Sequence, residues 1–315
     1  MKVQVKKKVV AAEGIVEIEL ADPNGAPLPA FSAGAHIDVV LGNGLVRQYS
    51  LCNNPSDRSS YVLGVLLEPE SRGGSKAMHA LQEGDIIEIS EPRNHFPLNH
   101  DARHSVLVAG GIGITPILCM AERLAHIGAS FELHYCTRSP ERTAFKNRIE
   151  QEHLREKSRI YHDTAPADER FDINRVVANP VPDRHLYVCG PAGFIEMVLN
   201  AAKAAGWNEA NLHREYFTGV VQDTSNDGSF QVKLASSGQV ITVPADKSIV
   251  EALAAEGIDI PVSCEQGVCG TCLTRVLEGE IDHRDLYLTD AEKEANDQIL
   301  PCCSRSKSAM LVLDL

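Results

Sequence analysis

The sequence lacks an excess of positive charge. Its 315 residues include 30 Lys and Arg against 43 Asp and Glu, which gives a formal net charge of −13. Because the phosphates of a nucleic acid attract a basic surface, this balance argues against a nucleic-acid partner. An acidic surface instead suits a partner or substrate that tolerates negative charge.

Long apolar segments are also missing. The N-terminus MKVQVKKKVV alternates polar and apolar residues, as a first strand would, and no continuous apolar stretch follows it, so we expect no signal peptide. Residues 105–121 are 17 uncharged residues in a row, which approaches the length of a membrane span. Gly110, Gly111 and Pro116 interrupt this stretch. A strand, a glycine turn and a helix fit it better, and we expect no membrane association.

Cysteine, by contrast, is plentiful. Nine cysteines, an odd number, in a chain without a secretion signal indicate a reducing compartment, so we expect a cytoplasmic protein. Such thiols are more often metal ligands, core residues or redox groups than disulfides. No cysteine has a histidine two residues after it, so the chain lacks the Cys-x-His pairs that a Rieske centre needs.

Three regions of the sequence differ in pattern. Residues 1–102 contain short strand-like runs broken by Gly, Pro and Asn turns, which predicts a small antiparallel barrel. Residues 103–222 alternate strand-like and helix-like runs, which predicts a parallel α/β sheet. Small and polar residues at 223–228 indicate a linker. Residues 229–315 contain a predicted hairpin, an amphipathic helix and a cysteine-rich segment.

The cysteine-rich segment CEQGVCGTCL, residues 264–273, has C-x4-C-x2-C spacing. The later segment ILPCCSRS supplies a further thiol, and 29 residues lie between Cys272 and Cys302. This is the spacing of a plant-type [2Fe-2S] cluster, whose iron and sulfide favour thiolate ligands. Gly267 and Gly270 allow the loop to wrap tightly. A zinc site is the alternative, although zinc sites usually combine C-x2-C with a second short pair. The predicted cluster ligands are Cys264, Cys269 and Cys272, with a fourth from the adjacent pair Cys302 and Cys303, which the spacing alone barely separates.

The order of these regions resembles the phthalate dioxygenase reductase family over essentially the full length, and within it most resembles the reductase subunits of vanillate O-demethylases. The resemblance implies an FMN-binding barrel over residues 1–102 and an NAD(H)-binding domain over 103–222. It also implies a plant-type ferredoxin domain with a β-grasp fold over 229–315. The family pattern of a ligand, an apolar residue and Ser-Arg matches Cys302–Arg305, so the resemblance implies that Cys302 is the fourth ligand and that Cys303 takes the apolar position. The fold class is therefore multidomain, with an antiparallel β-barrel, a parallel α/β domain and a β-grasp domain.

Two segments carry the flavin resemblance. RQYSLC, residues 47–52, matches the family's R-x-Y-S-L strand, in which Tyr and Ser contact the flavin ring and Arg meets phosphate. SRGGSKAMHAL, residues 71–81, places glycines and a serine before a predicted helix, where free N–H groups can bind an anion. FMN is favoured, and FAD stays open. The implied flavin contacts are Arg47, Gln48, Tyr49, Ser50, Leu51, Arg72, Gly73, Gly74 and Ser75.

Four segments carry the nicotinamide resemblance. AGGIGITPI, residues 109–117, resembles a pyrophosphate loop, and YVCGP, residues 187–191, resembles the turn beside the nicotinamide. EYF, residues 215–217, resembles the segment that closes over the flavin, and 135–145 is where the adenosine ribose should lie. The implied contacts are Gly110, Gly111, Gly113, Thr115, Pro116, Thr137, Arg138, Cys189, Gly190, Pro191 and Phe217, and Cys189, Ser50 and Phe217 are the predicted catalytic residues.

The choice between NADH and NADPH is less direct. NAD-preferring relatives often place an acidic residue where this chain has Ser139, because a carboxylate bonds the ribose hydroxyls and repels a 2′-phosphate. Arg138 and Arg142 lie nearby. NADH is favoured on the resemblance, and NADPH stays open.

These sites together predict one function. A hydride carries two electrons, a [2Fe-2S] cluster accepts one at a time, and a flavin does both. We therefore expect electrons to pass from NADH through FMN and the cluster to a separate Rieske-type terminal oxygenase, which demethylates or hydroxylates aromatic compounds. The alternatives are a reductase for another kind of monooxygenase, and a redox carrier or sensor without turnover. We expect a monomer, and the sequence does not identify the substrate of the oxygenase.

Overall fold

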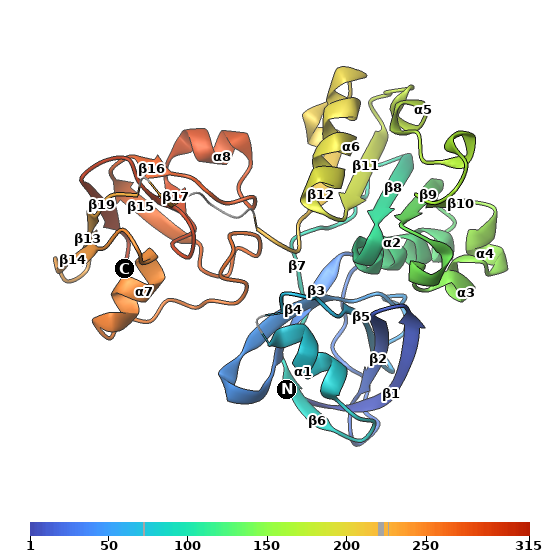
Figure 1. The fold of residues 1–315 in the computed structure, drawn as a ribbon, viewed down its shortest axis with the longest axis horizontal. Helices are drawn as coiled ribbons and strands as arrows, with labels where there is room; N and C mark the ends of the chain where they lie inside the picture. Colours follow the sequence, from blue (N-terminus) through green and yellow to red (C-terminus); the bar gives the residue numbers. More distant parts are fainter. Residues whose placement is uncertain (72, 220–223, 226) are drawn as a thin grey trace. The chain divides into compact units, whose positions relative to one another are not determined.

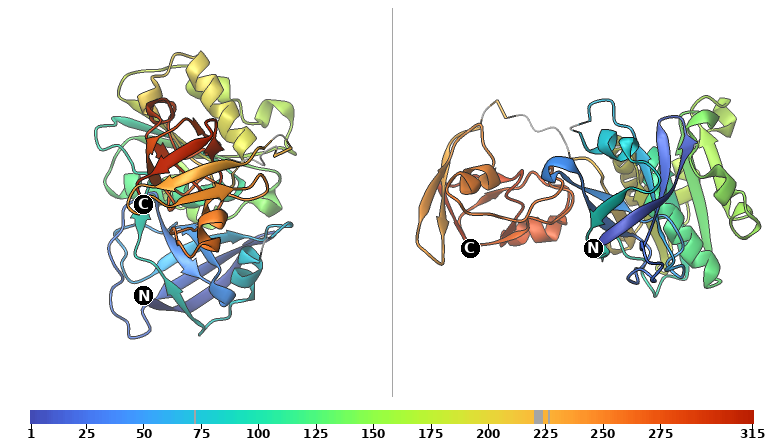
Figure 2. Two further views of the ribbon diagram at one scale, coloured as in Figure 1. Left: turned by 90° about the vertical axis from the view of Figure 1, so that its left-hand side faces the viewer. Right: turned by 90° about the horizontal axis from the view of Figure 1, so that it is seen from below.

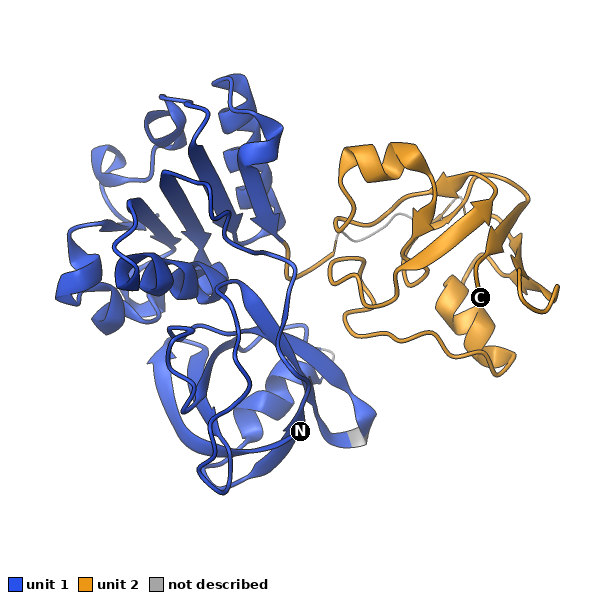
Figure 3. Ribbon diagram, turned by 180° about the vertical axis from the view of Figure 1, so that it is seen from behind, with its two compact units in different colours: residues 1–215 blue, residues 216–315 orange. Residues whose placement is uncertain are grey.

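The computed structural model describes residues 1–71, 73–219, 224–225 and 227–315. They form two compact units, residues 1–215 and residues 216–315 (Figure 3). Each unit has its own hydrophobic core, and each is described here by itself.

The first sheet of unit 1 is antiparallel. Its strands follow the order β4-β3-β6-β1-β2-β5, with β7 paired to β3 (Figure 1). An isolated bridge between Leu51 and Leu63 joins the residue after β4 to β5, so the two ends of this path meet in a barrel. The elements are β1 (Lys2–Ala12), β2 (Ile15–Ala21), β3 (Ala35–Val40), η1 (Gly42–Gly44), β4 (Val46–Ser50), β5 (Tyr61–Leu66), α1 (Gly74–Ala80), β6 (Ile86–Ile89) and β7 (Arg93–Asn94).

Alternating side chains explain these strands. In β1 the residues Val3 and Val5 are buried, while the lysines beside them are more exposed. Successive side chains of a strand point to opposite faces, so the alternation gives the sheet one apolar face. The apolar face fills the barrel, with Ile18, Leu20 and Ile37 at its centre.

The second sheet of unit 1 is parallel, with the strand order β10-β9-β8-β11-β12. The central strand β8 is buried from Ser105 to Gly110, which explains why its sequence is a continuous apolar run. Its elements are β8 (His104–Gly110), η2 (Gly111–Gly113), α2 (Ile114–His126), β9 (Phe131–Thr137), η3 (Pro140–Arg142), α3 (Lys146–Ile149), α4 (Glu152–Arg155), β10 (Ser158–His162), η4 (Ala167–Glu169), α5 (Ile173–Val177), β11 (Arg184–Cys189), α6 (Ala192–Ala204), η5 (Glu209–Asn211) and β12 (Leu212–Glu215).

The connections of this sheet create a switch point. From β8 the chain crosses through α2 to β9, and from β11 it crosses through α6 to β12, in the opposite direction across the sheet. Because such crossovers are right-handed, the two helices lie on opposite faces. The loops after β8 and β11 therefore meet at the carboxyl ends of the two central strands, where open α/β sheets bind ligands.

The barrel and the parallel sheet share one core. Ala12, Cys52 and Phe96 from the barrel region belong to the same buried cluster as Ile117 and Tyr135. This common core explains why residues 1–215 form a single unit although the sequence predicts two regions there.

Unit 2 contains a mixed five-stranded sheet with the order β14-β13-β19-β15-β17 and a small β16-β18 pair. β13 and β19 run parallel, and α7 packs on the sheet, as in a β-grasp fold (Figure 2). The elements are β13 (Phe230–Leu234), β14 (Val240–Val243), α7 (Ile249–Ala255), β15 (Thr274–Glu278), β16 (Ile281–Asp282), α8 (Asp290–Ala295), β17 (Gln298–Ile299), β18 (Arg305–Ser306) and β19 (Met310–Leu313). The three predicted fold types are confirmed.

Candidate functional site

The predicted flavin strand is β4 together with the residue after it. Ser50 and Leu51 are buried, whereas Arg47, Gln48 and Tyr49 are half-buried. Burial raises the pKa of the Tyr49 phenol to about 12, so this side chain stays neutral at physiological pH. A neutral, half-buried aromatic ring suits contact with a flat, largely uncharged ring system.

The glycine turn before α1 lies against β4. Gly73 caps the helix with φ +101°, a conformation that favours glycine, and Gly74 and Ser75 are the first helical residues. A Cβ added at Gly74 would lie 2.7 Å from Cγ of Arg47, so only glycine leaves room for the arginine. The structure thus brings Arg47 to the Gly73–Ser75 turn, a cradle that fits a phosphate group. Arg72 lies outside the described residues, and the flavin contacts stay predictions.

A carboxyl group that the sequence patterns did not single out lies beside Ser50. The Ser50 hydroxyl donates a hydrogen bond to Oε2 of Glu215, the last residue of β12, over 3.3 Å. The enclosed surroundings of this half-buried residue raise the pKa of Glu215 to about 8. At neutral pH the carboxyl is therefore mostly protonated and can itself donate a hydrogen bond. Its position at the carboxyl end of a parallel strand was the signal that could have identified it.

Cys189 completes this group of three polar side chains. It ends β11, is fully buried, and pairs in register with Glu215 on one side and Ala109 on the other. Burial, and then the neighbouring Glu215, raise the pKa of the Cys189 thiol well above its usual range. The thiol therefore stays neutral. Ser50, Cys189 and Glu215 converge from three strands, and their catalytic roles stay predictions.

The two predicted nicotinamide loops pack directly against each other. Gly110 ends β8, and a Cβ added at Gly113 would lie 2.3 Å from the carbonyl oxygen of Cys189. A Cβ at Gly190 would lie 3.1 Å from Cα of Gly110. Gly111 has φ +54°. Glycine is required here because the two backbones approach more closely than a side chain allows.

Phe194, in the first turn of α6, covers both loops and was missed at the sequence level. A Cβ at Gly110 or Gly190 would lie 2.9 or 3.0 Å from its ring. Its ring centroid lies 6.0 Å from that of Phe171. Pro191, the residue before α6, is exposed beside this ring. An apolar ring over two glycine turns has no sequence signature beyond an ordinary helical phenylalanine.

Thr115 and Pro116 pack inside the protein. Both are buried in the first turn of α2, where proline is tolerated because no helical N–H partner is lost. The Thr115 hydroxyl donates to the carbonyl oxygen of Ile112 over 3.1 Å. A Cβ added at Gly64 of β5 would lie 2.7 Å from Cγ2 of Thr115. Thr115 therefore joins the loop to the barrel, and cofactor contact by these two residues stays a prediction.

The predicted ribose segment follows β9. The Thr137 hydroxyl is buried and lies 2.9 Å from both the Thr143 hydroxyl and Nδ1 of His162, so it mainly holds the loop in place. Arg138 is exposed. Arg142 instead forms an ion pair with Glu13, at 3.0 Å between Nη2 and Oε1.

The four predicted cluster ligands lie together as two pairs of thiols. Cys264 shares a hydrogen bond with Cys269, and Cys272 shares one with Cys302. The bond from Cys264 lowers the pKa of the Cys269 thiol. A two-iron cluster takes two thiolates on each iron, so two pairs fit it. Among the described residues, no three His, Cys, Asp or Glu side chains are placed to hold a single metal ion.

The loop around these thiols is shaped for sulfur ligands. Gly267 and Gly270 have φ near +70°, and a Cβ on Gly270 would lie 2.3 Å from the ring of Tyr287. The N–H group of Gln266 points to Sγ of Cys264 over 3.3 Å. The Ser263 hydroxyl is buried and has no hydrogen-bond partner among the described residues. A sulfide-bearing cluster would offer acceptors to such groups, so the residues fit it.

Cys302 and Cys303 differ in their surroundings. The N–H group of Gly267 reaches the sulfur of Cys302. Sγ of Cys303 instead lies where a Cβ on Gly267 would stand, at 2.5 Å, and 3.7 Å from the carbonyl oxygen of Leu300. Cys302 is therefore paired with the Cys272 thiol, while the Cys303 thiol lies against Gly267 and is hydrogen-bonded to Cys302.

Phe217 follows β12 directly and is 37% exposed. Two residues later, the N–H group of Gly219 approaches Oε1 of Gln266, in the cluster loop, at 3.4 Å. The segment after β12 is thus attached to the cluster loop. The closing of Phe217 over the flavin stays a prediction.

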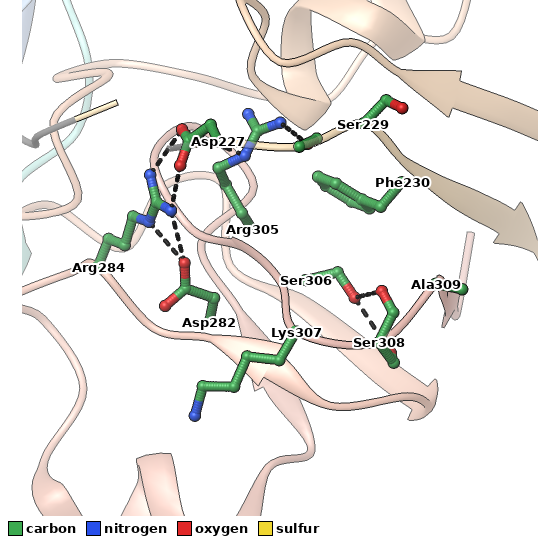
Figure 4. A pocket seen from close by; sticks show the side chains of 11 residues that line it. Asp227, Ser229, Phe230, Asp282, Arg284, Arg305, Ser306, Lys307, Ser308 and Ala309 are labelled. Carbon is green, nitrogen blue, oxygen red and sulfur yellow. Dashed lines mark hydrogen bonds and ion pairs between the residues drawn. The ribbon is translucent and has the colours of Figure 1, made fainter. Parts of the chain in front are cut away.

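A polar pocket in unit 2 lies outside all predicted sites (Figure 4). Arg284 binds both carboxylate oxygens of Asp227, at 2.6 and 2.9 Å, and Arg305 lies 3.4 Å from the same carboxylate. Arg305 also donates to backbone carbonyl groups of Lys247 and Gly228. These bonds fix the chain before β13 to the body of the unit, which is a structural role.

The chain was compared with known proteins. The profile of the 2Fe-2S iron-sulfur cluster binding domain matches residues 232–307, and that of the N-terminal domain of dimethylamine monooxygenase subunit DmmA-like proteins matches residues 89–212. A vanillate O-demethylase oxidoreductase from Pseudomonas putida is 56% identical over 96% of both chains. A phthalate dioxygenase reductase from Burkholderia cepacia is 42% identical and covers 100% of this chain and 97% of its own.

Solved structures agree with these relatives. The chain is similar to phthalate dioxygenase reductase, described as a modular structure for electron transfer from pyridine nucleotides to [2Fe-2S]. The TM-score is 0.76 at 42% identity, over 100% of this chain and 98% of that chain. Within the described residues, no helix is long and apolar enough to cross a membrane.

Proposed function

Because the chain belongs to the phthalate dioxygenase reductase family, we propose that it is the reductase component of a Rieske-type aromatic oxygenase or demethylase system. It is an oxidoreductase with FMN, NADH and a [2Fe-2S] cluster, and an oxygenase is its electron acceptor. One observation carries the proposal: the same chain contains two kinds of site. Unit 2 holds the two pairs of thiols, and unit 1 holds the converging side chains of Ser50, Cys189 and Glu215.

The Rieske type of the acceptor is an inference from two observations. The sequence has no Cys-x-His pair, so any Rieske centre of the system would lie on a separate protein. Its relatives include proteins named for vanillate O-demethylase and phthalate dioxygenase. We further propose that the protein works as a cytoplasmic monomer with domains at residues 1–102, 103–222 and 229–315, joined at 223–228.

The residues divide the work by position. When bound, FMN would supply exchange between two-electron hydride chemistry and the one-electron chemistry of a [2Fe-2S] cluster. Arg47, Gly73 and Gly74 hold the flavin phosphate, and Tyr49 and Ser50 contact the ring. Gly110, Gly113 and Gly190 let the two loops that would bind the dinucleotide pack against each other. Cys189 leaves room for the nicotinamide, and the protonated Glu215 holds a proton beside Ser50. Cys264, Cys269, Cys272 and Cys302 ligate the cluster.

A second candidate acceptor is another kind of monooxygenase. The match of residues 89–212 to a domain named for a dimethylamine monooxygenase subunit favours it. A carrier or sensor without turnover is the remaining alternative, and rapid multiple turnover with an artificial acceptor would exclude it.

The decisive experiment supplies the purified holoprotein with NADH and three acceptors in turn: ferricyanide, cytochrome c, and a purified aromatic Rieske oxygenase with its substrate. We expect turnover with all three, and chromatography of the released flavin should show FMN. Reduction of ferricyanide without support of any Rieske oxygenase, together with support of a different monooxygenase, would favour the second candidate.

A further inference from the structure

The positive charges in the segment after β9 do not match the dinucleotide that the chain is expected to bind. Arg138 and Arg142 lie where the adenosine ribose is expected, and position 139 carries a serine instead of an acid. Guanidinium groups bind phosphates with two parallel hydrogen bonds. Two arginines without an acid would therefore favour a 2′-phosphate, whereas the dinucleotide of this chain is NADH.

One of these arginines is occupied by a residue from the barrel. Arg142 holds Glu13 with two bonds, at 3.0 Å from Nη2 to Oε1 and 3.4 Å from Nε to Oε2. Glu13 lies in the turn between β1 and β2. Its backbone N–H group also donates to the carbonyl oxygen of Glu141 over 2.9 Å. The barrel turn is therefore fixed to the ribose segment through both its backbone and its side chain.

A second carboxylate lies in the same segment. The Ser139 hydroxyl donates a hydrogen bond to the side chain of Glu141, which lowers the pKa of that carboxyl. An acidic group is thus held two residues after the position where it was expected. Glu13 offsets the charge of Arg142, and Glu141 adds a second negative charge to the segment.

We propose that Glu13 is a specificity-determining residue that selects NADH over a 2′-phosphorylated dinucleotide by holding Arg142 in an ion pair. A 2′-phosphate would compete with the Glu13 carboxylate for the same edge of the guanidinium. It would also bring its negative charge close to Glu141. The inference rests on the nicotinamide site of the proposed function.

The expected effect is modest because the pair is exposed. The side chains of Arg142 and Glu13 are 45% and 60% exposed. Exposed ion pairs contribute little and are screened by salt. Removing the carboxylate should therefore strengthen binding of a 2′-phosphate by about three- to fivefold at low salt, and by less at high salt.

The test measures binding apart from turnover. Wild-type and Glu13→Gln holoproteins are titrated calorimetrically with adenosine 2′,5′-bisphosphate and with AMP, at low and high salt. Glu13→Gln should bind the bisphosphate about three- to fivefold more tightly, with the AMP affinity as the reference. The ratio of kcat/KM for NADPH to that for NADH should rise by a similar factor. In the double variant Glu13→Gln/Arg142→Gln the gain should disappear.

The matched control breaks another exposed ion pair of the same sheet. Glu19→Gln removes the partner of Lys6, which lies 2.9 Å away, and should change neither affinity. Equal bisphosphate affinity in Glu13→Gln and wild type overturns the proposal, as does a gain that persists without Arg142. Failure of wild type to oxidise NADH would instead reject the proposed function, while the binding data would still decide the role of Glu13.

Discussion

The adjacent thiols of Cys302 and Cys303 give the sharpest test at the scale of single residues. Cys302 shares a hydrogen bond with Cys272 and receives the Gly267 N–H group, whereas the Cys303 thiol lies against Gly267 and is hydrogen-bonded to Cys302. We predict that Cys302→Ser loses the cluster, measured by visible absorption and electron paramagnetic resonance. The variant should still reduce ferricyanide with NADH but should fail with cytochrome c.

Cys303→Val is the matched control for this prediction, because it replaces a packed thiol with an apolar group of similar size. It should keep the cluster signals. Loss of the cluster in Cys303→Val, with retention in Cys302→Ser, would reverse the assignment of the fourth ligand.

Glu215 predicts a pH dependence. Its pKa is raised to about 8 in the folded protein, so below that pH the native state holds a proton that the unfolded chain releases at its ordinary, lower pKa. The contribution of this proton to the free energy of unfolding is complete at acidic pH. It is lost as the pH rises toward 8, by no more than about 1.4 kcal/mol per pH unit. The thermal unfolding temperature of the flavin-free protein should therefore fall more steeply between pH 6 and 8 in wild type than in Glu215→Gln. Parallel curves for the two proteins would contradict this role.

Single residues were predictable where chemistry fixes their spacing. Four thiols around a cluster leave a pattern in the sequence, and all four come together. Glu215, Phe194 and Glu13 leave no such pattern, because each acts through a contact between segments far apart in the chain. The resemblance also implied a cofactor contact for Thr115, which stays a prediction, and the hydroxyl of this residue is bonded within its own loop.

At the scale of elements, the contact between the two nicotinamide loops can be tested at Gly113. Gly113→Ala would place a Cβ 2.3 Å from the Cys189 carbonyl oxygen, a backbone atom that cannot move aside cheaply. We predict a loss of about 1–3 kcal/mol of stability. Because the loops would be pushed apart, kcat/KM for NADH should fall at least about tenfold, which corresponds to ~1.4 kcal/mol.

Gly193→Ala serves as the control, since a Cβ at Gly193 of α6 meets nothing within 4 Å. This change should not lower the free energy of unfolding, because alanine is a better helix former than glycine. It should leave kcat/KM for NADH within about twofold of wild type, because the added methyl group touches nothing. Similar losses in both variants would show that the effect at Gly113 is not steric.

Elements were predictable where local pattern and tertiary structure agree. The hairpin around Ser236 and Ser237 is confirmed as β13 and β14, and the helix after it as α7, which begins with a capping box at Ser248. The short β16-β18 pair and the place of β19 between β13 and β15 were not predicted. Pairing between distant short strands depends on packing, which the local sequence does not contain.

At the scale of the whole molecule, the separate cores predict two unfolding transitions. The core of unit 2 includes Cys272, with Cys302 and Cys303 packed against it. Metal binding is coupled to folding. Removing the cluster from the full chain with a chelator should therefore lower the unfolding temperature of unit 2 by several degrees, as measured by calorimetry. The other transition, which belongs to residues 1–215, should stay in place. A single transition that shifts as a whole would contradict this independence.

The sequence predicted three regions, and the structure groups them as two units. Alternating strands and helices distinguish the barrel from the parallel sheet clearly. Their joint core, in which Cys52 and Phe96 meet Ile117, joins residues that are far apart in the sequence and that look like ordinary core positions. Composition and periodicity show which residues are buried, but not which region buries them.

The central place of β19 has a consequence for how the protein is made. Chains are synthesised from the N-terminus, so all four cluster cysteines leave the ribosome before residues 310–313, which lie between β13 and β15. The sheet beside the cluster loop cannot close until this last strand emerges. We therefore expect iron and sulfide to be loaded only after residue 313 has been translated.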